Sequence, residues 1–208
     1  MLILIFDTET TGLPTERNPS INDLHKWPHI IQISWVIYDD VQKCVVDEYD
    51  KIIAIPADVT LSEGAVQVHG ITRERSVKEG IHIRVALFDF KTALNRCGMI
   101  VGHNLSFDKR LIMVEGKRQG IYMGVNMLEY CTMKNGINLC RIPKTVTYGT
   151  DEFKYPRLIE LYTFLYGDSA VIPDNLHNSK VDVDICLQCF VRMQELGIGG
   201  SSMGNNNA

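Results

Sequence analysis

The feature that most constrains this chain is an apolar run at its start that ends in two acidic residues. Residues 1–6 are all apolar, and Asp7 and Glu9 follow with one threonine between them. Alternate side chains of a β-strand share a face, so a strand through this segment directs both carboxylates to the same side. Two carboxylates at the end of a buried strand repel each other and lose hydration unless a cation lies between them. Mg²⁺ or Mn²⁺ is the expected cation, because these ions prefer oxygen ligands.

Length and composition indicate one globular domain. The 208 residues are enough to bury a core, and 45% hydrophobic with 22% charged residues is ordinary for a globular protein. A formal net charge of −4 argues against broad binding along a phosphate backbone, but it does not exclude holding one strand end through metal ions.

The same survey favours an intracellular protein that does not enter a membrane. No apolar run is long enough for a membrane span, and the N-terminal run lacks the basic start and the cleavage site of a signal sequence. Six cysteines at irregular spacing are more typical of reduced thiols than of a disulfide framework. We therefore expect a cytoplasmic location, or a nuclear or viral-factory location if the source is a eukaryote or a virus.

The order of β-rich and helical patterns predicts an α/β domain with a mixed sheet, over residues 1–196. After the first strand, further strands are expected at 30–38, 44–55, 99–101 and 126–132. Helices are expected at 61–70, 84–96, 104–114, 156–165 and 180–196. Residues 136–155 are expected to form a loop. Residues 197–208, rich in Gly, Ser and Asn, are expected to be a disordered tail, either natural or added to the natural chain.

Two further segments place acidic residues at the ends of regular elements. In residues 101–108 a buried strand ends, and Asp108 lies in the first turns of the helix that Asn104 is expected to cap. In residues 177–182, His177 lies in a loop and Asp182 in the first turn of the last helix. Each position alone has a simpler explanation, because acids are common at helix N-termini and loop histidines are commonly exposed. The combination of four acids and one histidine in three segments favours a catalytic site.

Together the three segments resemble the motifs of the DEDDh family of 3′→5′ exonucleases. That family includes the epsilon proofreading subunit of bacterial DNA polymerase III and oligoribonuclease. The resemblance extends from Phe6 to about Leu196, and it includes Val68-His69-Gly70-Ile71, which is similar to an element of the epsilon group. It implies a ribonuclease H-like fold, with a central five-stranded mixed sheet flanked by helices.

The resemblance also implies a catalytic mechanism. Asp7, Glu9, Asp108 and Asp182 would hold two divalent ions, Mg²⁺ or Mn²⁺, and His177 would be the general base. The two ions would stabilise the attacking and leaving oxygens of an in-line displacement that releases a nucleoside 5′-monophosphate from a 3′ end. By the same analogy, the residues that contact the terminal nucleotide would be Thr10, Thr11, Gly12, Leu13, His69, Asn104 and Phe107. Leu13 would wedge against the last base, although Thr10 and Leu13 are equally well explained as turn and core residues.

The preferred substrate is single-stranded DNA, and three alternatives stay open. The chain could be an exoribonuclease of the same family, since nothing in it reads a 2′-hydroxyl decisively. It could be a nucleic-acid-binding module without activity, which the intact set of acids argues against. It could also be a proofreading subunit with a polymerase partner in DNA replication or repair. A tail that is short and lacks an apolar anchor slightly favours a standalone nuclease.

Three other features are given less weight. Asp184 lies two residues after Asp182 and therefore on nearly the opposite side of a helix, so it is left out of the site. Cys186 and Cys189 fall on an apolar helix face and are interpreted as core residues rather than zinc ligands. The segment 135–155 carries Asn138, Arg141, Lys144 and Tyr148, and it is either part of a substrate channel or a surface insertion.

Overall fold

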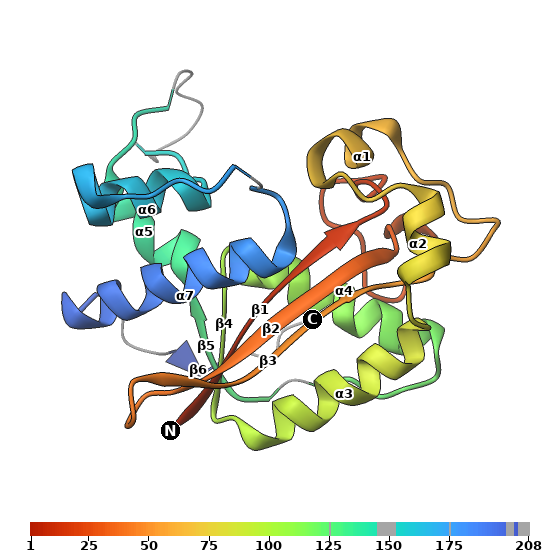
Figure 1. Ribbon diagram of the computed structural model, residues 1–208, viewed down its shortest axis with the longest axis horizontal. Helices are drawn as coiled ribbons and strands as arrows, with labels where there is room; N and C mark the ends of the chain where they lie inside the picture. Colours follow the sequence, from red (N-terminus) through yellow and green to blue (C-terminus); the bar gives the residue numbers. More distant parts are fainter. Residues whose placement is uncertain (125, 145–152, 175, 199–201, 204–208) are drawn as a thin grey trace.

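Strand β1 (Leu2–Thr10) lies in the middle of a mixed sheet in the computed structural model (Figure 1). The structure describes residues 1–124, 126–144, 153–174, 176–198 and 202–203. The other strands are β2 (Ile30–Asp39), β3 (Cys44–Ile52), β4 (Met99–Gly102), β5 (Leu128–Cys131) and the short β6 (Ser202–Met203). They are arranged in the order β3-β2-β1-β4-β5-β6, with β4 parallel to β1, β5 parallel to β4, and the remaining pairs antiparallel. The expected five-stranded mixed sheet is confirmed, and β6 adds two residues at its edge.

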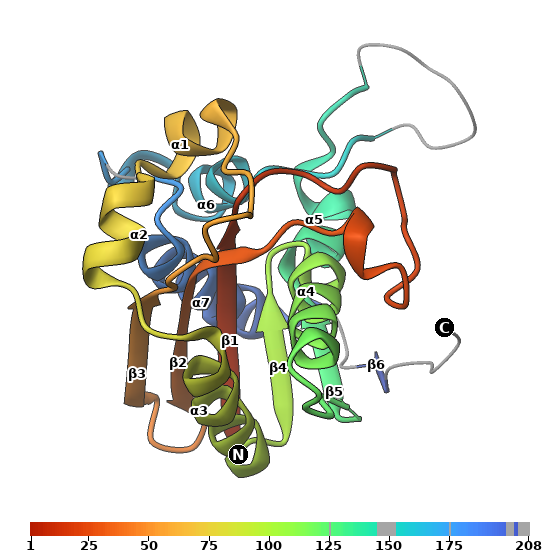
Figure 2. The same ribbon diagram turned by 90° about the vertical axis from the view of Figure 1, so that its right-hand side faces the viewer.

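Helices cover both faces of this sheet. They are α1 (Glu63–His69), α2 (Arg73–Glu79), α3 (Ile83–Arg96), α4 (Leu105–Arg118), α5 (Thr132–Cys140), α6 (Leu158–Tyr166) and α7 (Ser179–Glu195), with 3-10 turns at Leu24–Lys26 and Gly167–Ser169. Helices α3 and α4 pack on one face, and α7 packs on the other with α6 beside it (Figure 2). In the described part of the chain, no helix combines the length and apolar character needed to cross a bilayer.

The alternation of side chains along β1 supplies both cores. Leu4 and Phe6 are buried in the cluster beneath α3 and α4, while Ile3 and Ile5 are buried in the cluster beneath α7. Asp7 and Glu9 continue the series of Ile3 and Ile5, so their carboxylates face α7. The same alternation directs Thr8, between them, toward α4.

Strand β1 is longer than its apolar run. It continues through Asp7 and Glu9, as expected for two acids that share a face of the strand, because β2 pairs with it up to Thr10. Strand β3, in contrast, ends at Ile52 rather than at residue 55. Helix α2 was not predicted, and its seven residues are too short for a clear helical period.

The prediction of a loop from residue 136 is wrong for its first residues, because α5 continues to Cys140. Gly136 and the asparagines of this segment favour loops intrinsically. However, Gly136 is buried against Pro156 and Leu161, and this packing on α6 overrides the local preference. Tyr148 and residues 145–152 lie outside the described residues, as do 199–201 and 204–208, so the expected disorder of the tail stays a prediction.

Candidate active site

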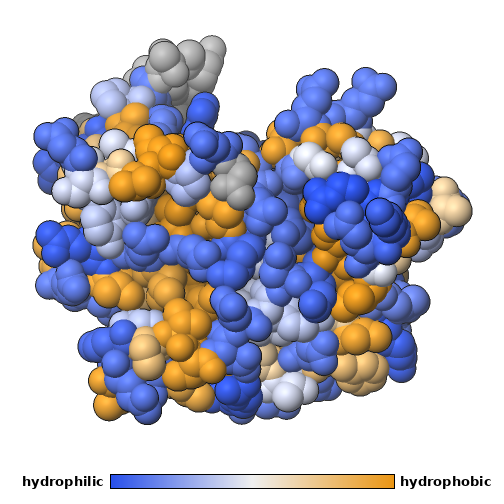
Figure 3. Space-filling view, viewed as in Figure 1, coloured by the Kyte–Doolittle hydropathy of each residue, from blue (hydrophilic) through white to orange (hydrophobic). Residues whose placement is uncertain are grey.

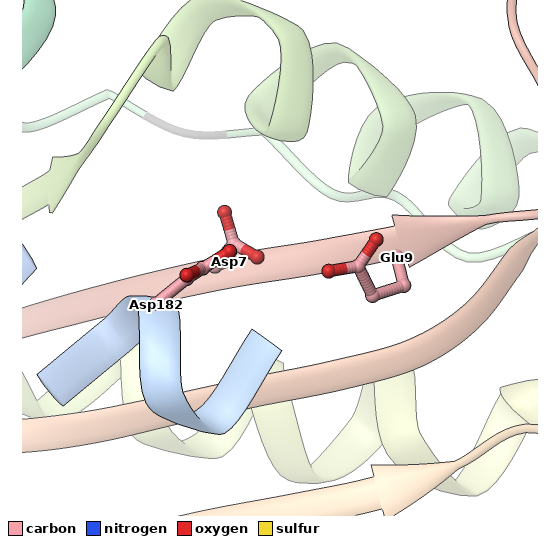
Figure 4. Close-up of side chains that lie close together, drawn as sticks. All are labelled: Asp7, Glu9 and Asp182. Carbon is pink, nitrogen blue, oxygen red and sulfur yellow. The ribbon is translucent and has the colours of Figure 1, made fainter. Parts of the chain in front are cut away.

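Three carboxylates meet where β1 approaches the first turn of α7. Asp7 and Glu9 come from β1 and Asp182 from α7, and each offers an oxygen within 4.8 Å of the others (Figure 4). The two acids of β1 lie on one side of the strand because they are two residues apart. Asp182 reaches them because α7 packs over this face of the sheet. The grouping is therefore a product of strand alternation and helix packing together.

The electrostatics of this cluster disfavour its charged form. Burial raises the pKa of Asp7 well above its usual range, and the carboxylates of Asp108, Asp182 and Glu9 raise it further. Burial, followed by Asp182 and Asp108, raises the pKa of Glu9 to about 8. Among the described residues, the charged side chains that act on the pKa of Asp7 or Glu9 are other carboxylates. Closely spaced carboxylate oxygens with raised pKa values are a suitable donor set for a hard divalent cation.

Asp108 joins the cluster from the other side of the sheet. Its Oδ1 accepts a hydrogen bond from the Thr8 hydroxyl at 2.6 Å and another from the Thr8 backbone N–H at 3.2 Å. Burial raises the pKa of Asp108 to about 7, although both bonds from Thr8 oppose this change. Because Thr8 uses Oδ1 twice, Oδ2 is the oxygen of Asp108 that these bonds leave for a cation. The structure thus groups three of the four predicted acids directly and holds the fourth against β1.

His177 lies just before α7, exposed to solvent. Its backbone has a φ of 65°, a left-handed conformation that histidine adopts more readily than most residues. Burial raises the pKa of Asp182, while the charge of His177 and a hydrogen bond from its backbone oppose this change. Asn178 caps the helix, because its side chain accepts a hydrogen bond from the Lys180 N–H at 3.1 Å. His177 therefore lies next to a capped helix end and near Asp182.

The turn after β1 is held in place by several hydrogen bonds. The Thr10 hydroxyl donates to the Gly12 carbonyl at 2.7 Å, as expected for a turn residue. Thr11 is buried, and its N–H donates to the His29 carbonyl at 2.9 Å. This N–H is therefore not free to bind a phosphate while the bond persists. Thr11, one of the residues predicted to contact the terminal nucleotide, therefore uses its N–H to hold the turn.

His69 also supports this turn. Its Nδ1 accepts the Ile71 N–H at 3.0 Å, so the ring proton is on Nε2 and points to the Thr10 carbonyl, 3.3 Å away. Burial lowers the pKa of His69, which favours the neutral ring that this pair of bonds requires. Gly70, the next residue, ends α1 with a φ of 70°, where a side chain would be strained. His69 therefore lies beside the predicted nucleotide site as a support for β1.

The remaining predicted contacts differ in exposure. Leu13 is 85% exposed, so it is not the core residue that was one of the two explanations for it. Phe107 is partly buried against the core, with its ring tilted against that of Trp27 at 6.1 Å. Asn104 occupies the N-cap position of α4 as predicted, but its φ is 66° and its side chain makes no capping bond.

The molecular surface is hollowed between α6 and α1, and hydrophilic residues border this hollow (Figure 3).

Sequence reasoning missed two groups at the site. Thr8 was passed over because it lies between the two acids, yet strand alternation alone places it on the face opposite to theirs. Gln32 and Ser34 were interpreted only as parts of a β-rich run, although they are its buried polar residues on the face toward α7. Asp184 and the two helical cysteines are placed as predicted: Asp184 pairs with Lys180 at 2.8 Å, and Cys186 and Cys189 are buried in the core.

A mixed sheet covered by helices, with acidic residues brought together at its central strand from β1, α4 and α7, is the ribonuclease H-like fold that the resemblance implies. Among proteins of this fold class, the chain matches one family by sequence: residues 4–123 match the model of the family described as Exonuclease (RNase_T). The match covers more than half of the chain, which therefore belongs to this exonuclease family. No curated protein matches the sequence.

Solved structures support the same fold. Cell-death related nuclease 4 (CRN-4) is similar with a TM-score of 0.67 and 18% identity, over 95% of this chain and 64% of that protein. E. coli Exonuclease I in complex with a dA16 oligonucleotide is similar with a TM-score of 0.68 and 15% identity, over 93% of this chain and 41% of that one. A further Exonuclease I structure has a TM-score of 0.70 at 14% identity, again with 41% of its length covered. The chain thus spans less than two thirds of these proteins, and the similarity concerns the fold.

Proposed function

We propose that this protein is a metal-dependent 3′→5′ exonuclease that removes nucleoside 5′-monophosphates from single-stranded DNA. The observation that carries the proposal is the meeting of Asp7, Glu9 and Asp182 within 4.8 Å, where no basic side chain in the described part of the chain acts on the pKa of the first two. A cluster of this kind is costly in a fold unless it binds cations. Membership of the exonuclease family supplies the reaction class.

Asp7, Glu9, Asp108 through Oδ2, and Asp182 are the residues that would hold two divalent ions, Mg²⁺ or Mn²⁺. The chemistry that such ions supply is stabilisation of charge on the attacking and leaving oxygens of a phosphodiester. The carboxylates would hold the ions at one end of β1, and the reacting phosphate would be oriented there. Thr8 contributes by directing one oxygen of Asp108 away from the site's centre.

His177 is the proposed general base. It is exposed and lies next to α7, so its ring can approach a water molecule beside the terminal phosphodiester and take its proton. A base outside the buried cluster keeps contact with solvent and can return the proton to water. Leu13, which is almost fully exposed, is proposed to pack against the last base.

DNA is the proposed substrate over RNA. The support is that E. coli Exonuclease I, which shares the fold, was solved with dA16 and dT13 oligonucleotides. The acidic net charge of −4 agrees with a grip confined to one strand end, because extended binding to a phosphate backbone needs a basic surface. The protein itself is proposed to be intracellular.

The test is digestion of matched DNA and RNA oligonucleotides labelled at either end, with Mg²⁺ or Mn²⁺. Mononucleotides should be released stepwise from the 3′ end, faster from DNA, and EDTA should stop the reaction. His177→Ala should lower the rate by roughly 10²-fold, since loss of a general base costs on the order of 10²–10⁴. His25→Ala is the matched control, an exposed histidine in the 3-10 turn Leu24–Lys26, and it should retain the wild-type rate.

Three outcomes would contradict parts of the proposal. Release from the 5′ end would disprove the polarity, and faster digestion of RNA would indicate an exoribonuclease. Failure of a folded, metal-binding protein to cut any substrate would indicate a binding module, or a proofreading subunit that needs its polymerase.

A further inference from the structure

A strip of polar side chains crosses three strands on the face that α7 covers. In the register of the sheet, Ser34 of β2 lies opposite Asp7 and Gln32 lies opposite Glu9. Asp50 of β3 lies opposite Ser34 in turn. Ser34 and Gln32 are 0% and 2% exposed, on a face where their neighbours Val36 and Tyr38 belong to the apolar core. Buried polar groups in such a place need hydrogen-bond partners, and these come from Asp50 and from the start of α7.

The direction of each bond in the strip can be worked out from Asp50. Its Oδ1 accepts from the Ser34 hydroxyl at 2.7 Å, because an ionised carboxylate has no proton to donate. The single hydroxyl proton of Ser34 is then used. The bond of 2.6 Å between Ser34 and Ser179 must therefore be donated by Ser179, which is itself fully buried.

Gln32 is oriented by the same carboxylate. Its amide nitrogen donates to Asp50 Oδ1 at 2.8 Å, so its carbonyl oxygen faces α7 and accepts the Ser179 N–H at 3.4 Å. The amide nitrogen also lies 3.5 Å from Asn178 Oδ1, the oxygen that caps α7. Gln32 and Ser34 together contact the backbone N–H of Ser179 and the side chains of Asn178 and Ser179.

Asn178 and Ser179 directly follow His177 and precede Asp182 by four and three positions. We infer that Gln32 and Ser34 are positioning residues, which hold the start of α7 so that His177 stays in reach of the carboxylate cluster. The inference rests on the proposed function for the role of His177 as general base. The link from Gln32 and Ser34 to the start of α7 rests only on the hydrogen bonds described above. The link and the role of His177 can therefore be tested separately.

The principal variant is Ser34→Ala, with Gln32→Met as a second variant of similar length. Ser76→Ala is the matched control, because Ser76 is also 0% exposed and its hydroxyl also makes two hydrogen bonds, to Ile53 and Ile55. A loss of stability alone should be similar in the two serine variants. We expect Ser34→Ala to lower kcat roughly tenfold with KM little changed, in the range seen when the partner of a catalytic group is removed. Ser76→Ala should leave kcat unchanged.

A double-mutant cycle separates positioning from general damage. In a His177→Ala background, assayed on residual activity with Mn²⁺, Ser34→Ala should have little further effect on kcat, because its effect is transmitted through His177. Fully multiplicative effects would overturn the inference. So would a kcat for Ser34→Ala equal to that of Ser76→Ala.

Amide hydrogen exchange gives a readout that does not depend on catalysis. The N–H groups of residues 177–182 should exchange faster in Ser34→Ala than in the wild type and in Ser76→Ala. If the wild type proves inactive, the proposed function fails while this comparison still decides the link. Equal exchange in both serine variants would overturn the link itself.

Discussion

Thr8 shows how one side chain decides which atom of a neighbour is available. Its hydroxyl and its N–H both bind Oδ1 of Asp108, a carboxyl whose pKa is raised to about 7 by burial. Without these bonds the carboxyl could rotate, and its pKa would rise further because they favour the charged form.

Thr8→Val keeps the shape of the side chain and removes the hydroxyl. We expect activity to fall by roughly 10-fold to 100-fold, as for other groups that orient a metal ligand. Steady-state kinetics over a Mg²⁺ titration would measure it, with more Mg²⁺ needed for half-maximal rate. Thr92→Val is the control, since the Thr92 hydroxyl donates to Phe88 on the exposed side of α3. A Thr8 variant as active as the control would contradict this account.

Leu13 is the other residue whose environment leads to a clear expectation. An apolar side chain that is 85% exposed adds little to stability, so its substitution reports on substrate contact. Leu13→Ser should change the free energy of unfolding by less than about 0.5 kcal/mol. It should raise KM roughly tenfold, because burial of a leucine side chain against a base stabilises the complex by about 1.5 kcal/mol. Val41→Ser, at a position 78% exposed in the β2–β3 turn, should leave KM unchanged. Equal KM values for both variants would argue against a role of Leu13 in binding.

Among elements, the attachment of α4 to the segment before β2 is the clearest case of buried charge. Glu115 and Arg118 form an ion pair of 2.7 Å whose side chains are only 2% and 12% exposed. Arg118 also donates to the carbonyls of Leu24, Trp27 and Pro28, while the Ile30 N–H donates to Glu115. This ties the segment that leads from the site turn into β2 to the side of α4.

Arg118→Ala should therefore lower the free energy of unfolding by about 3 kcal/mol, because it leaves the buried carboxylate of Glu115 without its main partner. Urea denaturation would measure the change. Arg192→Ala removes a partner of Glu195 at the same i, i+3 spacing, but that pair is 44% and 57% exposed. Its loss should be below about 1 kcal/mol. Similar losses in both variants would show that burial does not set the strength of these pairs.

For the whole molecule, the carboxylate cluster links stability to pH and to metal. The pKa of Glu9 is about 8 against an ordinary 4.5, and that of Asp108 is about 7 against 3.8. At a pH between the ordinary and the raised pKa values, the folded protein binds more protons than the unfolded chain, so stability falls as the pH rises. The contribution is present in full below the ordinary pKa values and is lost as the pH passes about 8.

In EDTA, Tm should accordingly decrease between about pH 5 and about pH 8. Mg²⁺ or Mn²⁺ should raise Tm, and more at the higher pH, since a cation binds the deprotonated carboxylates. Thermal unfolding followed by circular dichroism would measure both effects. Asp7→Asn should weaken both the pH dependence and the response to metal. A Tm in EDTA that is flat or rises over this interval would contradict the assignment of raised pKa values.

The local pattern was sufficient for the elements with a strong period. The β-rich run 30–38 predicted β2 almost to the residue, and the helical pattern of 84–96 predicted α3. It failed for α5, where Gly136 suggests a loop and packing against α6 decides for a helix. Intrinsic preferences amount to about 1 kcal/mol for a residue, so one buried contact is enough to reverse them.

The sequence by itself determined that Asp7 and Glu9 share a face, because a strand repeats every two residues, and that Asp108 and Asp182 stand near helix starts. Only the tertiary structure decided that Asp182 meets the first two acids from α7, while Asp108 comes from the opposite face and is held by Thr8. It also decided that Gln32 and Ser34, 145 or more residues before their partners in the chain, hold the start of α7. Contacts between distant segments depend on the register of the sheet and the packing of helices, and no local period encodes either.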